Sequence, residues 1–440
     1  MESFLIKALQ LIMSLSILVI VHEFGHYIFA RMFNIRVEKF YLFFDAGFAL
    51  FRYKPKNSHT EYGVGWLPLG GYVKISGMID ESMDKDQLAL PPQPWEFRTK
   101  PAWQRLLVMV AGVFFNLILA FFIYSMVLFA WNDTYLPLKN VTQGMEFSRA
   151  AKNAGFQDGD ILLMADDKEL ERFGVRTLLD VADAGTVTVK RDGETVVLVM
   201  EEGLMKNLLT DQEGFATYRI PTVIYETMEA SSAELAGLTP GDSIVAVNGV
   251  ITPAFTDLRD VLEDNRDSEV TLDYYRDGTH YSTTALLDSA GTLGFYVMPA
   301  ALVYNTRTLT YGFFESFPAG IKMGIQTLKD YIAQFKYVFT KEGASSLGGF
   351  GAIGNLFPAQ WNWQAFWMMT AFLSVILAFM NILPIPALDG GHVIFLIYEV
   401  VTKRKPNEKV MEYAQIAGMV LLFALVLYAN GMDIIRAIFK

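Results

Sequence analysis

The sequence predicts a polytopic α-helical membrane protein with four transmembrane helices and two β-rich domains inserted between the second and third helices. Three observations support this prediction. The 440-residue chain is 52% hydrophobic and yet carries a formal net charge of −11. Its apolar residues are gathered in four long runs, and a long acidic segment separates the first two runs from the last two. The chain is too long for one small domain, and because it has no cysteine, disulfides and thiolate chemistry are excluded.

Four apolar runs are long enough to cross a bilayer as helices. They are Phe4–Met32, Leu106–Trp131, Ala365–Leu383 and Ala414–Tyr428. The first run lacks the basic start and the small-residue cleavage site of a secretory signal peptide. We therefore expect it to be retained as the first transmembrane helix.

The charged residues predict the orientation in the membrane, because Lys and Arg are enriched on the cytoplasmic side. Between the first two runs, residues 31–105 hold 11 Lys or Arg and 8 Asp or Glu, and the link between the last two runs reads "TKRKPNEK". Residues 132–300 hold 13 Lys or Arg and 29 Asp or Glu. We expect loops 34–104 and 399–410 to be cytoplasmic, and the acidic insert and both chain ends to lie outside.

The acidic insert contains an internal repeat. "SRAAKNAGFQDGDILLMADDKEL" is echoed by "SSAELAGLTPGDSIVAVNGV", with Gly155 and Asp160 matching Gly237 and Asp242 at a constant offset of 82 residues. Each copy continues into alternating segments around an Asp-Gly pair, which is a strong hairpin signal. The phrase "AGLTPGDSIVAVNG" resembles PDZ domains, so we expect two PDZ-like domains. Such domains bind extended peptides by strand addition. Two domains that only occupy space, or that exclude large substrates sterically, need no peptide ligand, and we assign none.

The segment after the insert has apolar residues at helical spacing. It predicts an amphipathic helical linker on the outer membrane face, and an ordinary helix packed between the insert and the membrane is the alternative.

The first apolar run contains ionisable residues in the stretch "VHEFGH". His22 and His26 are one helical turn apart and share a face, and Glu23 lies beside them. This His-Glu-x-x-His pattern is typical of zinc peptidases, with the histidines as ligands and the glutamate as general base. Ionisable groups in a membrane helix are rare unless they are functional. A proton or ion pathway is the alternative interpretation.

A catalytic zinc site usually has three protein ligands, and the third run offers candidates in "NILPIPALDGGH". The third ligand is a carboxylate or His392, and Asp389 lies at the same predicted depth as the two histidines. Asp389 capping the following helix is the alternative. We interpret His392 as a supporting or structural residue, His59 and His280 as solvated, and the acidic stretch 80–86 as a solvated loop without metal.

Four motifs together, "VHEFGH", "LPLGGYVKISG", "AGVFFN" and "NILPIPALDGG", resemble the intramembrane site-2 zinc proteases over the whole chain. The resemblance implies a Zn²⁺ ion held by His22, His26 and Asp389, with Glu23 activating water. It also implies that Asn381 contacts the substrate backbone near the scissile bond.

The same resemblance implies a membrane-associated β element in the first cytoplasmic loop. We expect Gly70, Gly71 and Tyr72 to contact substrate there, in a loop or hairpin that dips toward the membrane, and a plain cytoplasmic hairpin is the alternative. Asn116 of "AGVFFN" is a further substrate-binding candidate. Relatives often have Gly-Pro-x-x-Asn at this motif, whereas Val113 stands here in place of the proline, which leaves the local shape open.

The resemblance implies a zinc metalloendopeptidase of the bacterial inner membrane. Its expected partners are the lipid bilayer and single-span membrane proteins already trimmed outside, such as an anti-sigma factor of the envelope stress response and remnant signal peptides. The PDZ pair would act as a size filter, and no nucleic acid is expected. An ion-coupled transporter and an inactive scaffold are the alternatives, although the chain lacks the paired broken helices of many transporters.

The predicted segments, in order, are the first transmembrane helix with the zinc motif (1–33), the cytoplasmic loop with the β element (34–104), the second transmembrane helix (105–131), the two PDZ-like domains (132–215 and 216–300), the amphipathic linker (301–362), the third transmembrane helix with the third ligand (363–398), a cytoplasmic loop (399–410) and the fourth transmembrane helix (411–440).

Overall fold

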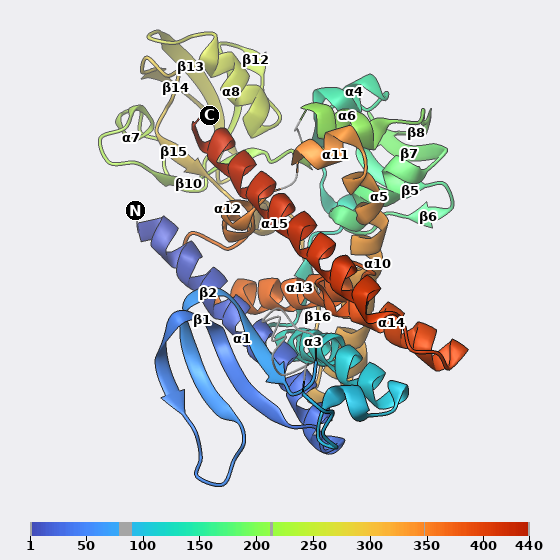
Figure 1. Ribbon diagram of the computed structural model, residues 1–440. Helices are drawn as coiled ribbons and strands as arrows, with labels where there is room; N and C mark the ends of the chain where they lie inside the picture. The colour runs from blue at the N-terminus through green and yellow to red at the C-terminus, as the bar shows by residue number, and fades with distance from the viewer. Residues whose placement is uncertain (1, 79–89, 212–213, 347, 439–440) are drawn as a thin grey trace. The chain divides into compact units, whose positions relative to one another are not determined.

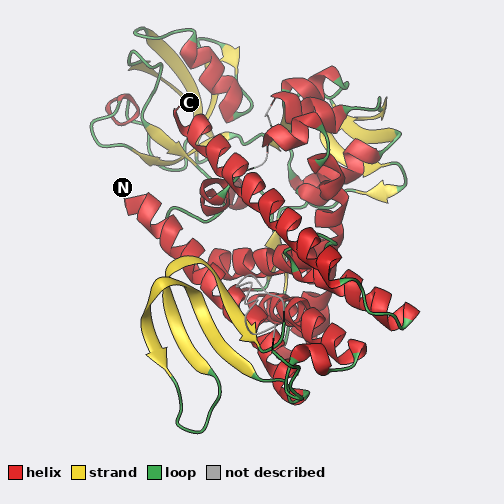
Figure 2. Cartoon of the chain, viewed as in Figure 1, coloured by secondary structure: helices red, strands yellow, loops and turns green. Residues whose placement is uncertain are grey.

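The computed structural model describes residues 2–78, 90–211, 214–346 and 348–438, and the acidic stretch 80–86 lies outside the described residues. The chain divides into two compact units (Figures 1 and 2). The first comprises residues 1–132, 310–335 and 347–440, and the second comprises residues 133–309 and 336–346.

Four helices in the first unit are long and apolar enough to cross a membrane. They are α1 (Glu2–Met32), α3 (Ala102–Trp131), α13 (Trp363–Ile382) and α15 (Glu408–Ile438). Each contains one of the predicted apolar runs, apart from one residue at the end of α13. The helix α15 is much longer than its run, because polar residues that hydropathy leaves out continue the helix at both ends.

The helix α3 contacts α1, α13 and the shorter helix α14 (Asp389–Thr402). A Cβ atom on Gly25 of α1 would lie 2.6 Å from the carbonyl oxygen of Ala111 in α3. Small residues at such a crossing let two membrane helices approach closely. This close crossing brings the face of α1 that carries the two histidines against α3.

The predicted linker contains one long helix, α10 (Phe313–Val338). Its Gly320 and Gly324 face α3, since added Cβ atoms would lie 2.3 Å from Ser125 Oγ and 2.5 Å from the ring of Phe121. The helix therefore packs directly on a candidate membrane span. This contact supports the alternative of a packing helix.

A sheet formed by β1 (Val37–Tyr53) and β2 (Glu61–Ile75) lies in the loop between α1 and α3. Different parts of β1 and β2 pair with each other, so the two strands form four segments that lie side by side in the order 71–75, 37–42, 61–64 and 49–53. The segment "LPLGG", expected to be a loop or hairpin, is instead part of β2, and Gly70 has a φ of +150° there. Glycine accommodates this angle, which lets the strand continue to a second place beside β1.

The inserted segment forms two β-rich domains, each with its own hydrophobic core. The first contains β4 (Met145–Phe147), α4 (Arg149–Asn153), β5 (Ile161–Ala165), β6 (Lys168–Glu169), α5 (Val175–Asp183), β7 (Thr186–Arg191), β8 (Glu194–Val199), α6 (Leu204–Asp211) and β9 (Ala216–Tyr218). Its strands pair in the order β6-β5-β7-β8, with β4 paired to β9.

The second β-rich domain contains β10 (Thr222–Thr227), α7 (Ser232–Leu235), β11 (Ser243–Val247), β12 (Val250–Ile251), α8 (Phe255–Glu263), β13 (Glu269–Arg276), β14 (Thr279–Leu286) and β15 (Phe295–Val297). Its strands pair in the order β14-β13-β11-β10-β15.

The remaining described elements are β3 (Asp133–Tyr135), α9 (Ala300–Val303), β16 (Arg307–Leu309), α11 (Lys341–Ser346), α12 (Phe350–Asn355) and two single-turn helices at Phe97–Thr99 and Leu138–Asn140.

The internal repeat of the sequence recurs as a repeated ion pair. Arg191 reaches the fully buried Asp160 at 2.7 Å, and Arg276 reaches the fully buried Asp242 at the same distance. Both predicted hairpins are confirmed, because β7 pairs with β8 and β13 with β14 across the two Asp-Gly turns.

Candidate metal centre

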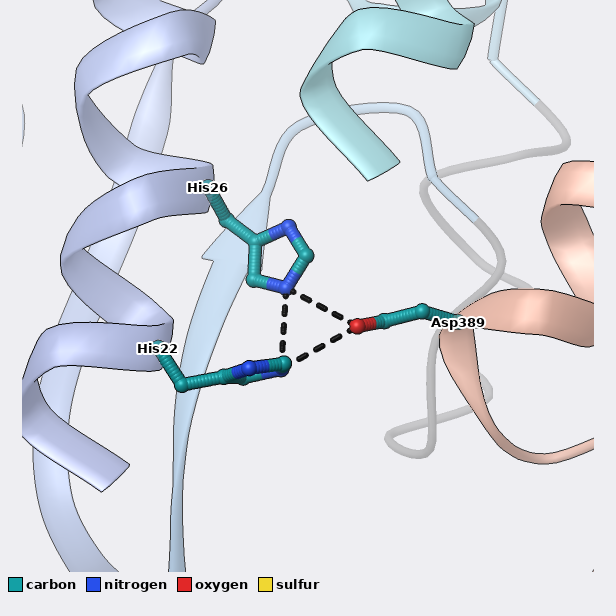
Figure 3. A group of neighbouring side chains, drawn as sticks. All are labelled: His22, His26 and Asp389. Carbon is teal, nitrogen blue, oxygen red and sulfur yellow. Dashed lines mark hydrogen bonds and ion pairs between the residues drawn. The ribbon is translucent and has the colours of Figure 1, made fainter. Parts of the chain in front are cut away.

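The two histidines of α1 are buried and their rings point to the same place (Figure 3). His22 and His26 are one turn apart, and their Nε2 atoms lie 3.2 Å from each other. The helix therefore places two imidazole nitrogens within reach of a single metal ion, as the spacing predicts.

Asp389 completes the group from the other end of the sequence. It is the first residue of α14, after the proline-containing stretch that ends α13. Its Oδ2 atom lies 3.1 Å from Nε2 of His22 and 3.3 Å from Nε2 of His26. The N-cap residue of α14 is Leu388, so the carboxylate of Asp389 faces the histidines and is not the cap of its own helix.

The three ligand atoms fit a tetrahedral zinc ion. In such a site, bonds of about 2.0 Å place neighbouring ligand atoms about 3.3 Å apart, and the three observed distances lie between 3.1 and 3.3 Å. Oδ2 of Asp389 is buried and makes no hydrogen bond of good geometry with any described residue, so a cation would supply its missing partner. Two imidazoles with one carboxylate suit zinc better than magnesium or calcium, which prefer oxygen ligands.

The helix α3 forms the surface on which both imidazoles lie. A Cβ atom on Gly112 would be 2.5 Å from Nε2 of His26 and 2.6 Å from Cε1 of His22. The other ring nitrogen of His26, Nδ1, lies 2.8 Å from the carbonyl oxygen of Val108. Sequence reasoning missed both positions, and the only signal for Gly112 is its place inside "AGVFFN".

Two asparagines contact opposite nitrogens of His22. Asn116 of α3 is fully buried, and its amide nitrogen lies 3.2 Å from Nδ1 of His22. Asn381 of α13 has its amide nitrogen 3.4 Å from Nε2, on the side of the metal group. The hydroxyl of Ser374 donates a hydrogen bond to the main-chain carbonyl of Asn116 at 2.8 Å. The structure thus brings both predicted asparagines to the same histidine.

Glu23 lies beside the metal group and touches the sheet formed by β1 and β2. The backbone N–H of Val73 lies close enough to the Glu23 carboxylate to stabilise its charge. Val73 belongs to residues 71–75, which pair with β1 on one side and form one edge of that sheet. An edge strand therefore runs next to the candidate general base, a contact that sequence reasoning did not identify.

The three other predicted substrate-contacting residues lie in or just before this edge. A Cβ atom on Gly71 would lie 2.6 Å from Cγ1 of Val19 in α1, so glycine lets the strand approach that helix. The hydroxyl of Tyr72 donates to Asp45 at 2.8 Å, and its ring stacks on Tyr41. Burial is the main cause that raises the pKa of the Tyr72 phenol, and the hydrogen bond to Asp45 raises this pKa further. Gly70 precedes them at the bend of β2.

The other histidines lie apart from this group. Among the described residues, the metal-binding group consists of His22, His26 and Asp389. His59 and His280 are exposed. His392 lies in α14, three residues after Asp389, and is not a member of the group.

Comparisons with known proteins extend over almost the whole chain. It is 28% identical to Protease RseP of Yersinia pestis, over 97% of each chain. It is 27% identical to the Regulator of sigma E protease of Haemophilus influenzae, over 99% of this chain and 100% of that protein. It is 26% identical to Metalloprotease MmpA of Caulobacter vibrioides, over 99% of this chain and 97% of that protein. The model of peptidase family M50 matches residues 10–425. The chain, with its four helices that are long and apolar enough to cross a membrane, is therefore a multi-pass membrane protein that belongs to peptidase family M50, the site-2 proteases.

Proposed function

We propose that this protein is an intramembrane zinc endopeptidase in which His22, His26 and Asp389 hold the zinc ion and Glu23 is the general base. The observation that carries the proposal is the convergence of three ligand atoms, all within 4.8 Å of one another, contributed by a candidate membrane span and by the start of α14. Membership of a peptidase family supports hydrolysis of a peptide bond over ion transport.

The chain's own residues account for the proton transfers. Bound zinc would polarise the scissile carbonyl and lower the pKa of a coordinated water. Glu23 accepts a proton from the attacking water and then donates it to the leaving amine. The nearby backbone N–H of Val73 stabilises the charge of this carboxylate beside the metal group. The main-chain carbonyl of Val108 holds the ring of His26 in its binding orientation.

An unwound stretch of substrate needs partners for its backbone groups, because unsatisfied amides are costly inside a membrane. Residues 71–75 form a sheet edge next to Glu23, and we propose that substrate pairs along this segment. Gly70 and Gly71 leave room for its backbone, and Tyr72 supports the edge by stacking on Tyr41. Asn381, beside the metal group, contacts the substrate backbone near the scissile bond.

The expected substrates are single-span membrane proteins already shortened outside the membrane. Two relatives are named as a sigma E regulator and as Protease RseP, which supports an anti-sigma factor as one substrate, with remnant signal peptides as another. The two β-rich domains are PDZ-like by their repeated "AG…GD" phrase and act as a size filter. The acidic charge of the insert supports a position outside the cytoplasm, in the inner membrane of a bacterium, with loops 34–104 and 399–410 inside.

The experiment compares the wild-type protein with Glu23→Gln on a tagged, pretrimmed single-span substrate in the same membranes. We expect the variant to lose at least 100-fold in cleavage rate, which is the usual contribution of a general base. It should retain about one zinc per chain, because Glu23 is not in the metal-binding group.

The matched control is Glu2→Gln, the same change at an exposed position at the start of the same helix. It should cleave like the wild type. Zinc-free wild-type protein would overturn the proposed site, and full cleavage by Glu23→Gln would overturn the role of Glu23.

A further inference from the structure

The amide of Asn116 occupies the side of His22 that faces away from the metal group. Asn116 is fully buried in α3, one turn after Gly112, and its amide lies 3.2 Å from Nδ1 of His22. The opposite ring nitrogen, Nε2, faces Asp389 and His26. Asn116 is therefore screened from substrate but touches the ring of a metal ligand.

A histidine that binds a metal through Nε2 must carry its proton on Nδ1, since the lone pair of Nε2 is used for the metal. That N–H group then requires an acceptor. In the described structure the amide nitrogen of Asn116 faces Nδ1, while its oxygen, Oδ1, is buried and makes no hydrogen bond with a described residue. A half-turn of the amide, whose nitrogen and oxygen ends have almost the same shape, brings Oδ1 to Nδ1.

We propose that Asn116 is a positioning residue for the metal site, whose side-chain oxygen accepts the Nδ1 proton of His22 and thereby fixes the ring with Nε2 toward the metal. The proposal rests on the zinc site proposed above and differs from the substrate contact that the motif implied. Groups that orient metal-binding histidines in this way commonly change metal affinity 10- to 100-fold when they are removed.

The two metal-binding histidines are held by different kinds of partner. Nδ1 of His26 faces the main-chain carbonyl of Val108 at 2.8 Å, which no side-chain substitution removes. His22 depends instead on a side chain. The backbone of Asn116 is itself fixed from α13, because Ser374 donates to its carbonyl oxygen. A defect at Asn116 should therefore affect one ligand of the site and leave the other in place.

The test measures the zinc dissociation constant of the full-length protein by competition with a chromogenic chelator. Asn116→Leu keeps the size of the side chain and removes the acceptor, so we expect zinc to bind 10- to 100-fold more weakly. Asn116→Asp keeps an acceptor at the same position and should bind zinc at least as tightly as the wild type. Thr370→Val, which removes a buried hydroxyl of α13 that bonds within its own helix to the carbonyl of Phe366, is the control and should bind zinc within about threefold of the wild type.

A second readout separates a positioning role from a substrate contact. At saturating zinc, Asn116→Leu should regain cleavage with a KM near that of the wild type, and its cobalt-substituted form should show an altered visible spectrum. Unchanged zinc affinity together with a raised KM would overturn the proposal and favour a substrate contact. Weakened zinc binding in both Asn116→Leu and Asn116→Asp would also overturn it, since loss of packing alone would then explain the effect. If the wild type itself binds no zinc, the proposed function fails; if the wild type binds zinc and Asn116→Leu binds it equally well, only the role of Asn116 fails.

Discussion

Gly112 lies where two imidazoles and a second helix meet, and its missing side chain is what allows both histidine rings to occupy their positions. At the scale of single residues, individual atomic contacts set the orientation of the metal-binding and catalytic side chains. His26 contacts a carbonyl oxygen, His22 contacts an amide, and a backbone N–H group lies beside the Glu23 carboxylate. Each of these contacts orients a group that the sequence motif already names.

Gly112→Ala should weaken zinc binding by at least 10-fold, because the added methyl group would overlap both rings and displace them. Chelator competition measures the effect. Gly431→Ala is the matched control, since an added Cβ there would meet nothing within 4 Å. Equal zinc affinity for Gly112→Ala and the wild type would show that the rings adapt to the extra volume.

At the scale of elements, the sheet of β1 and β2 connects the membrane helix α1 to the candidate substrate path. Its edge, residues 71–75, passes Val19 and reaches Glu23 on α1. Its far edge, residues 49–53, carries exposed apolar side chains such as Leu50. The two edges therefore have different surroundings within one sheet.

Gly71→Val should reduce cleavage at least 10-fold while zinc content stays near one per chain, because the larger side chain would force the edge away from Val19 and from Glu23. Cleavage and zinc are measured on the same preparation. Leu50→Ala at the opposite edge should leave cleavage within about twofold. Loss of zinc in Gly71→Val would instead indicate that the edge supports the metal site itself.

The second β-rich domain should be sensitive to acid through Asp242. Burial alone would raise the pKa of this carboxyl group, but Arg276 and the backbone of Thr239 stabilise its charge and hold the pKa below the usual 3.8. Because the folded-state pKa is the lower one, the stabilisation is present above the unfolded pKa and is lost as the pH falls through the folded value.

Asp242→Asn should therefore lower the stability of this domain at neutral pH by roughly 2 kcal/mol, since a neutral amide replaces the charge-assisted hydrogen bonds that the buried carboxylate makes with Arg276 and the backbone of Thr239. It should also remove part of the acid dependence below about pH 4. Hydrogen exchange of the paired strands β11 and β13 in the full-length protein measures both effects. Asp260→Asn, an exposed aspartate of the same domain, is the control, and an acid dependence in Asp242→Asn equal to that of the wild type would contradict this assignment.

At the scale of the whole molecule, the inserted segment begins and ends at neighbouring positions. Its first strand, β3, pairs with its last, β16, from Asp133 with Leu309 to Tyr135 with Arg307. The chain therefore leaves and returns at one place, which is the arrangement of a domain insertion that can be shortened without stretching the flanking segments.

Replacing residues 136–306 by a short Gly/Ser hairpin should produce a protease that cleaves an untrimmed single-span substrate, because the proposed size filter is removed. Zinc content should not change, since the metal-binding group lies outside the insert. The comparison uses trimmed and untrimmed substrates with both proteins, and Glu23→Gln in the shortened chain as the inactive control. Equal discrimination by both proteins would remove the filter from the proposed function.

Much of this organisation is local in origin and so could be predicted from the sequence. Hydropathy over a long window identifies the four apolar helices, and helical periodicity places His22 and His26 on one face. The Asp-Gly pairs predict the two hairpins because glycine accepts a positive φ. The two ends of α15 and the course of β2 through "LPLGG" were less predictable, since polar flanks and strand pairing lie outside these local rules.

The sequence by itself determined the spans, the repeat and which residue types could hold a metal. Only the tertiary structure decided that Asp389 and not His392 meets the two histidines, that Gly112 and Val108 hold their rings, and that the edge strand at Val73 reaches Glu23. The physical reason is that spacing along a helix fixes neighbours one turn apart, whereas contacts between distant segments depend on how closely helices and strands pack.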